Sequence, residues 1–257
     1  MGGAISAGAA DSNTSYKDFY VIDCVISNSA AMRCGAAYGG TFIRCRIHNT
    51  LASSNGSALG KANAVNCIFT KCTNHNSYYG FFYAEGRMVN CTVFGSKSTA
   101  ALAEARIYNC VFLGNNTTAK NLETNNLNEA ANIYATTGKN YNNATPDQLF
   151  APALGDFHPV TGSKTVTMGQ TEYLTTSCPF TLPEDLADEM FFDFEGTPID
   201  TNGTTIAAGA LQTPKTPKYG GILSFGYEIY DFRQRQNAKN PPQFSVKGRG
   251  TTPVEVE

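Results

Sequence analysis

The first half of the chain repeats one short pattern of apolar and polar positions, with a cysteine at the same place in each copy. The repeated cysteines are Cys24, Cys45, Cys67, Cys91 and Cys110. Successive copies lie 21, 22, 24 and 19 residues apart. A β-rich repeat with a period of about 20 residues is typical of a solenoid, in which one coil cannot bury its apolar face alone and stacks on its neighbours.

Alternation inside each copy predicts a β-strand. The residues two places before and two places after the cysteine are apolar, as Ile43 and Ile47 are around Cys45. A period of two, filled by Val, Ile and Phe, predicts a strand whose side chains at these positions point into the coil. The place three residues before the cysteine is also apolar, and we expect the coil to turn a corner there. Those residues are Val21, Phe42, Ala64, Met88 and Ile107.

Polar residues flank the strands. The residue immediately before each cysteine is polar, and we expect it to face outward or to sit in a turn. These residues are Asp23, Arg44, Asn66, Asn90 and Asn109. Downstream, Asn28, Asn49 and Asn115 occupy nearly equivalent places and are predicted to end the strand with a turn.

The segments between copies are rich in Gly, Ala, Ser and Asn and are too short for crossover helices, as 34–40 and 53–57 illustrate. Each coil must therefore consist of short strands and turns. The predicted fold is all-β, a single-stranded right-handed parallel β-helix over residues 1–212, with a short C-terminal extension. Within it, 115–145 is predicted as an irregular excursion, either a degenerate coil or a loop, and 146–212 as closing coils.

Two later segments resemble the end of a known solenoid family. They are Thr145–Phe150 with Gly155–Pro159 and Gly162–Ser163, and Asp193–Pro198 with Ile206–Gln212. In these motifs the chain resembles the secreted right-handed β-helix repeat proteins of the pectate-lyase-like superfamily, abundant in gut Bacteroidetes. Phe157-His158-Pro159 replaces the family's aromatic–arginine–leucine run. The resemblance implies an architecture and an extracellular, cell-surface or virion location. It does not imply one activity, because the superfamily includes lyases, hydrolases and phage tailspikes.

Residues 213–257 depart from that family. The stretch Thr213–Lys218 repeats Thr-Pro-Lys twice and is predicted to be a stiff linker. The rest is basic and interrupted by prolines, so we expect either an extended tail or an arm that docks a partner protein or a second copy of the chain.

Composition excludes several classes of partner. The chain carries 21 acidic and 19 basic residues, for a net charge of −2. A charge this small attracts neither nucleic acid nor an anionic membrane surface. No apolar run reaches the 18 or more residues of a membrane span. The N-terminus lacks the pattern of a signal peptide and resembles a turn between coils, so we expect the chain to be a piece of a longer protein.

The cysteines are predicted to be free. Stacked coils lie about 4.8 Å apart, whereas a disulfide requires Cβ atoms about 3.8 Å apart. Equivalent cysteines should then form a column of buried thiols in the core. Cys34, Cys72 and Cys178 fall outside that column, and a Cys67–Cys72 bridge is conceivable. No spacing typical of a zinc site occurs, so no metal or cofactor is predicted.

Candidate catalytic residues are sparse. Enzymes on this fold need clustered carboxylates, yet the polar row before the cysteines offers Asp23 alone. Glu85 and Glu104 are expected to form a salt ladder with Arg87 and Arg106 rather than a catalytic site. The three histidines are dispersed along the chain. They are His48, His75 and His158.

An aromatic run is the most suggestive local feature. Tyr78, Tyr79, Phe81, Phe82 and Tyr83 are candidates for glycan contact, because aromatic rings stack on sugars. The alternative is that alternate rings fill the solenoid core while the others cover an edge.

Three functional hypotheses follow. The first is a non-enzymatic β-helix, on a cell surface or virion, that contacts glycans or partner proteins. The second is a polysaccharide lyase or glycoside hydrolase whose active site is not evident in these residues. The third is a trimeric module similar to a phage tailspike, with 213–257 between subunits.

Overall fold

The computed structural model describes residues 3–6, 19–75, 82–83, 86–97, 106–115, 120–124, 127–128, 134–135, 141, 144–217, 245–247 and 253–255. The chain forms two compact units, Met1–Lys215 and Thr216–Glu257. In the second unit, strands β25 (Ser245–Lys247) and β26 (Pro253–Glu255) pair antiparallel.

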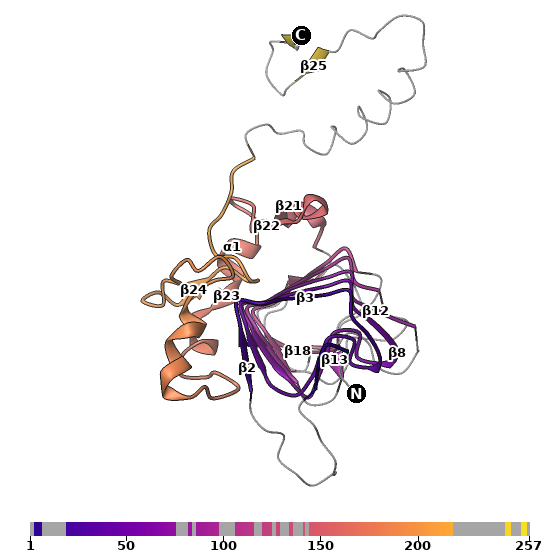
Figure 1. The fold of residues 1–257 in the computed structure, drawn as a ribbon. Coiled ribbons are helices and arrows are strands. Elements are labelled where there is room, and N and C mark those ends of the chain that lie inside the picture. Colours follow the sequence, from indigo (N-terminus) through magenta and orange to yellow (C-terminus); the bar gives the residue numbers. More distant parts are fainter. Residues whose placement is uncertain are drawn as a thin grey trace, which may run out of the picture. The chain divides into compact units, whose positions relative to one another are not determined.

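The first unit is built on a parallel β-solenoid, which confirms the predicted fold class (Figure 1). Each coil contributes strands to up to four parallel sheets. Sheet one contains β1 (Ile5–Ser6), β5 (Ala37–Tyr38), β9 (Leu59–Gly60) and β13 (Phe82–Tyr83). Sheet two contains β2 (Tyr20–Ile22), β6 (Thr41–Ile43), β10 (Asn63–Val65), β14 (Arg87–Val89), β16 (Arg106–Tyr108), β18 (Lys120–Thr124) and β20 (Tyr134–Ala135).

The other two sheets complete the coil. Sheet three contains β3 (Val25–Ser27), β7 (Arg46–His48), β11 (Ile68–Thr70), β15 (Thr92–Phe94), β17 (Val111–Leu113) and β19 (Leu127–Asn128). Sheet four contains β4 (Ala30–Arg33), β8 (Leu51–Asn55) and β12 (Thr73–Asn74). Strands β18, β19 and β20 belong to the predicted excursion. Strands β18 and β20 continue sheet two with register shifts, and β19 continues sheet three beside β17.

Residues in the left-handed conformation form the corners. Between sheets two and three, each polar residue before a cysteine has φ between 50° and 54°. Between sheets three and four, Asn28, Asn49 and Lys71 have φ of 55°, 51° and 54°, and Gly95 and Gly114 follow at 65° and 64°. Asparagine and aspartate tolerate this conformation better than other L-residues. The polar positions of the repeat are thus explained by backbone geometry.

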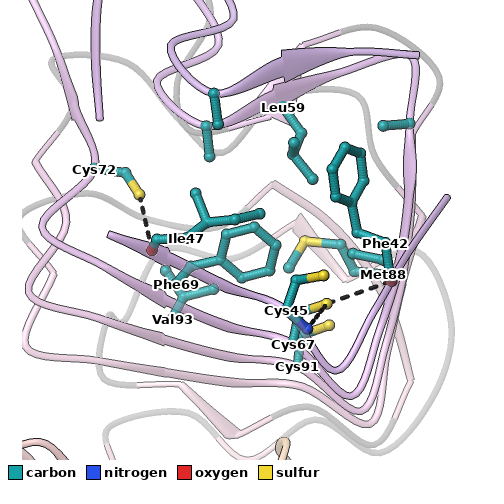
Figure 2. Close-up of a cluster of buried hydrophobic side chains, with 14 of the residues drawn as sticks. Phe42, Cys45, Ile47, Leu59, Cys67, Phe69, Cys72, Met88, Cys91 and Val93 are labelled. Atoms are coloured by element: carbon teal, nitrogen blue, oxygen red, sulfur yellow. Dashed lines mark hydrogen bonds between the residues drawn. The ribbon is translucent and has the colours of Figure 1, made fainter. Parts of the chain in front are cut away.

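The structure corrects which apolar positions face the interior. Phe42, Cys45 and Ile47 all point into the solenoid core, so the positions three before the cysteine, at it and two after it line the inside (Figure 2). The position two before the cysteine was predicted inside, but Ile43 and its equivalents Val65 and Val89 lie on the outer face of sheet two. The left-handed corner residue between them and the cysteine reverses the phase of the alternation.

The cysteine column also satisfies backbone groups at this corner. The N–H of Cys45 donates to Cys67 Sγ at 3.3 Å, and the N–H of Cys91 donates to Cys110 Sγ at 3.2 Å. Each thiol in turn donates to the carbonyl two residues earlier, as Cys67 Sγ does to Val65 O at 3.3 Å. A small residue that both accepts and donates fits this position.

Cys72 belongs to a second column, at the corner between sheets three and four. The residues that follow the left-handed position there are all small or polar. They are Ser29, Thr50, Cys72, Ser96 and Asn115. The N–H of Cys72 donates to Ser96 Oγ at 3.2 Å, and the N–H of Ser96 donates to Asn115 Oδ1 at 2.8 Å. At both corners, therefore, a backbone N–H donates to the side chain of the equivalent residue in the next coil, and the acceptor is a thiol or an oxygen.

All eight cysteines are free, and six of them are buried. Burial raises the pKa of Cys34 to about 12 and that of Cys72 to about 11. The pKa values of Cys67 and Cys91 are also raised, primarily by burial. Cys24 is exposed, against the expectation of a buried column, because its coil is the first of the stack that the structure describes.

We expect one fast thiol in a native titration. An aromatic disulfide reagent should modify Cys24 promptly and the half-buried Cys178 more slowly, since a thiol must be accessible and ionised to react. All eight thiols should react in denaturant. Substitution of Cys24 by serine should remove the fast phase. A fast phase that persists in this variant, or fewer than eight thiols in denaturant, would contradict the assignment.

Residues 144–215, here called the outer segment, add no coil to the solenoid, unlike the predicted closing coils. Their strands β21 (Leu149–Ala151) with β22 (Asp156–Pro159), and β23 (Gly169–Gln170) with β24 (Thr205–Ile206), pair antiparallel. The helices are η1 (Pro146–Gln148), η2 (Pro152–Leu154), α1 (Thr165–Met168), η3 (Thr171–Tyr173) and η4 (Glu184–Phe191). The segment lies along the outside of the coils (Figure 1).

Two further apolar cores hold the outer segment in place. On sheet two, Val65 and Val89 are buried against Leu174 and Met190. On sheet three, Ile68, Val111 and Leu113 are buried against residues that include Phe157 and Leu211. Burial of apolar surface stabilises a fold by about 25 cal/mol per Å². This explains why sheets two and three carry apolar side chains on their outer faces as well as on their inner faces.

Candidate functional site

The outer segment docks on the polar corner row, which it closes to solvent. Asn66 Nδ2 donates to Met190 O at 2.8 Å and to Phe192 O at 2.7 Å. Asn109 pairs with Gln170, donating to its carbonyl at 2.8 Å and accepting its N–H at 3.0 Å. These side chains are fully buried. The row predicted to face outward or into a turn does sit in a turn, but much of it is covered by protein.

Arg44 ties the first corner to the same segment. Its guanidinium donates to Asp23 at 2.7 and 2.8 Å, to Glu189 Oε2 at 2.7 Å and to Glu189 O at 2.6 Å. The hydrogen bonds from Arg44 lower the pKa of Asp23, although its burial opposes this shift. The Arg44 side chain is only 7% exposed. This charged group therefore serves docking, and it is not available to a ligand.

A groove remains open at the corner between sheets three and four. It has a volume of about 360 Å³ and runs along the stack across three coils. Its lining comes from equivalent corner segments, 28–30 in the first of these coils, 49–51 in the second, and Thr73 and His75 in the third. Asn49 Nδ2 donates to Asn28 Oδ1 at 2.7 Å, which holds the two exposed amides side by side.

The groove offers neutral hydrogen-bonding groups and a small apolar patch. The hydroxyls of Ser29 and Thr50 turn inward, to Gly35 O and Ser57 O. The amides of Asn28 and Asn49, the Thr73 hydroxyl and the His75 imidazole are left to face a ligand. Leu51, 37% exposed, supplies apolar contact. The described residues that line the groove include no carboxylate.

A second cavity, of about 260 Å³, lies between sheet three and the outer segment. In it, His158 Nδ1 contacts Asp156 Oδ1 at 2.6 Å and His158 Nε2 contacts Glu195 Oε2 at 3.3 Å. Lys215 Nζ donates to the other Asp156 oxygen at 2.6 Å. Asp156 would have a raised pKa from burial alone, but hydrogen bonds from Lys215 and His158 outweigh it and hold the pKa below its ordinary value.

Removal of the Lys215 charge should give a small, pH-dependent loss of stability. Because Lys215 is 40% exposed, we expect Lys215→Gln to lower the free energy of unfolding by less than about 1 kcal/mol at pH 7. A lowered pKa stabilises the fold above the unfolded-state pKa and ceases to do so as pH falls through the folded value. Urea titrations at pH 7 and at about pH 3 should therefore show the difference shrinking. A larger difference in acid would contradict this, and Lys164→Gln is the matched control.

The predicted glycan-contact residues fall almost entirely outside the described residues. Only the backbone of Phe82 and Tyr83 is described, where β13 pairs with β9. Glu85 and Glu104, the predicted partners of Arg87 and Arg106, also lie outside the described residues.

Two of the histidines, which are far apart in the sequence, lie in the two candidate sites. His75 lines the groove, and His158 lies at the centre of the charged cluster in the second cavity. The sequence did carry a signal for the groove, because Asn28 and Asn49 recur one coil apart. It carried none for the cluster, whose members are brought together by the path of the outer segment.

No protein-family model, curated protein or solved structure matches the chain. None of the helices in the described part of the chain has the length and apolar character needed to cross a bilayer. Among those same residues, no group of three or more His, Cys, Asp or Glu side chains is placed to hold a metal ion.

Proposed function

We propose that this protein is a non-enzymatic β-solenoid of the pectate-lyase-like type, displayed on a cell surface or virion, that binds a glycan along its side. The observation that carries the proposal is the groove across three coils, whose described lining residues supply amides, a hydroxyl and an imidazole and no carboxylate.

Saccharides suit such a lining. Their hydroxyls both donate and accept hydrogen bonds, as do amide and hydroxyl side chains. The repeat of Asn28 and Asn49 in successive coils gives equivalent contacts about 4.8 Å apart, within reach of neighbouring hydroxyls on one chain. A shallow, open groove fits an extended polymer better than a small molecule, which is usually enclosed.

The absence of carboxylates from the groove argues against turnover there, because glycoside hydrolysis requires a pair of them. Asp156 and Glu195 do lie together in the second cavity, but Asp156 is engaged by Lys215 and His158. Glu195 contacts the other nitrogen of the same histidine. This arrangement supports the non-enzymatic reading over the lyase or hydrolase alternative.

A glycan array paired with activity assays tests the proposal. The full chain should bind one or more polysaccharides, and incubation with the same polysaccharides should release neither reducing ends nor unsaturated products. Turnover of any bound polysaccharide would contradict the proposal. Failure to bind any glycan would contradict it as well and would favour contact with a partner protein.

A further inference from the structure

The second cavity differs in chemistry from the groove. Its lining combines charged and titratable side chains with five apolar ones: Ile68, Phe157 and Leu211, which are 2%, 2% and 3% exposed, and Phe194 and Leu154. Among the described residues, no serine, threonine, asparagine or glutamine side chain lines it. A lining of this kind fits a ligand that carries both an apolar part and a charged group.

The charged groups of the cavity are largely matched to one another. Both oxygens of Asp156 are engaged, one by His158 and one by Lys215. Glu195 Oε2 lies 3.3 Å from the other ring nitrogen of His158. Each of the two carboxylates therefore contacts a partner within the cavity.

Arg46 is the remaining cationic side chain of the cavity. Its guanidinium stacks over the Phe157 ring at 5.8 Å and lines the cavity, and it forms no ion pair with any described residue. Arg46 lies on the outer face of β7, so its position is fixed by the sheet. Guanidinium groups bind carboxylates through two parallel hydrogen bonds. The side chain is only partly exposed, which strengthens its attraction for an anion compared with a guanidinium in bulk water.

We propose that this cavity binds a small ligand with one carboxylate on an apolar body, such as an aromatic or branched aliphatic acid. The carboxylate pairs with Arg46, and the body lies on Ile68, Leu211 and the two phenylalanine rings. The volume of about 260 Å³ admits a molecule of this size. This site is separate from the glycan groove. The proposal made for it does not depend on whether the groove binds a glycan.

Benzoate is the test ligand, with benzamide and acetate as controls that lack the charge and the apolar body. Calorimetric titration of the full chain should show saturable binding of benzoate, at least tenfold tighter than that of either control. The affinity should fall as salt is added. No saturable binding of benzoate, or equal binding of benzamide, would overturn the proposal.

Variants locate the site. Arg46→Gln should weaken benzoate binding at least tenfold, whereas Arg106→Gln, an exposed arginine on β16 outside the cavity, should change it less than twofold. Unchanged affinity in Arg46→Gln would overturn the proposal. Should that variant not fold, nuclear Overhauser contacts in the wild type between benzoate ring protons and the Ile68 methyls decide the matter, and their absence with bound benzoate would overturn it.

Discussion

Replacement of Asn66 by glycine is expected to lower the free energy of unfolding by about 2–6 kcal/mol, since two buried carbonyls lose their donor at about 1–3 kcal/mol each. Those carbonyls belong to Met190 and Phe192, where the outer segment meets the solenoid. Glycine adopts the φ of 54° at this corner without strain, so the loss reports the docking hydrogen bonds rather than the turn.

Asn90 is the matched control for this substitution. It occupies the equivalent corner one coil later, has φ of 50° and is fully buried, but neither its Nδ2 nor its Oδ1 has a hydrogen-bond partner. Asn90→Gly should therefore change stability by less than about 1 kcal/mol, because no hydrogen bond is lost and an unsatisfied amide is removed. Urea denaturation followed by circular dichroism compares the two. An equal or larger loss in Asn90→Gly would show that the docking account of the corner row is wrong.

Gly35→Ala should lower the free energy of unfolding by at least as much as Asn66→Gly does. A Cβ at this position would lie 2.3 Å from Ser57 O and 2.8 Å from Leu51 O, both of them backbone atoms of the next coil. Side chains can rotate away from a clash, but these carbonyls are held by the coil stack. Two whole coils would have to separate, and we expect a loss of about 3 kcal/mol or more, at the upper end for overpacked sites.

The control for that substitution is Gly203→Ala in the outer segment. An added Cβ there meets nothing nearer than 3.9 Å. Its melting temperature should stay within about 2 °C of the wild type, whereas Gly35→Ala should melt more than about 5 °C lower. Equal melting of Gly35→Ala and the wild type would mean that the coils are less tightly stacked than the structure shows.

The repeat was predictable because one cysteine per coil marks it, but the phase of the strand was not. Period-two alternation across Ile43, Cys45 and Ile47 predicts that all three point inward. The structure places Ile43 outside, because Arg44 between it and the cysteine is left-handed. A single corner residue reverses the alternation, and a pattern of apolar positions alone does not reveal such a residue unless its conformation is inferred as well.

The outer segment could not be foreseen from local pattern either. Its sequence resembles the end of a solenoid, yet its strands pair with each other and its apolar residues cover sheets two and three. The covered faces explain an otherwise puzzling feature, apolar rows on both sides of the same strands. The path of the outer segment determines where the two candidate sites lie. The groove lies at a corner that the segment leaves uncovered, and the cavity lies between the segment and sheet three.

The most direct test of the central claim is a titration with whichever polysaccharide the full chain binds on the array. The wild type, the double variant Thr73→Val with His75→Ala, and the control Thr167→Ala would be compared by calorimetry. The account predicts that the double variant, which lacks a hydroxyl and an imidazole of the groove, binds at least tenfold more weakly, while the control matches the wild type. Equal affinity of the double variant and the wild type would contradict the claim that this groove is the glycan site.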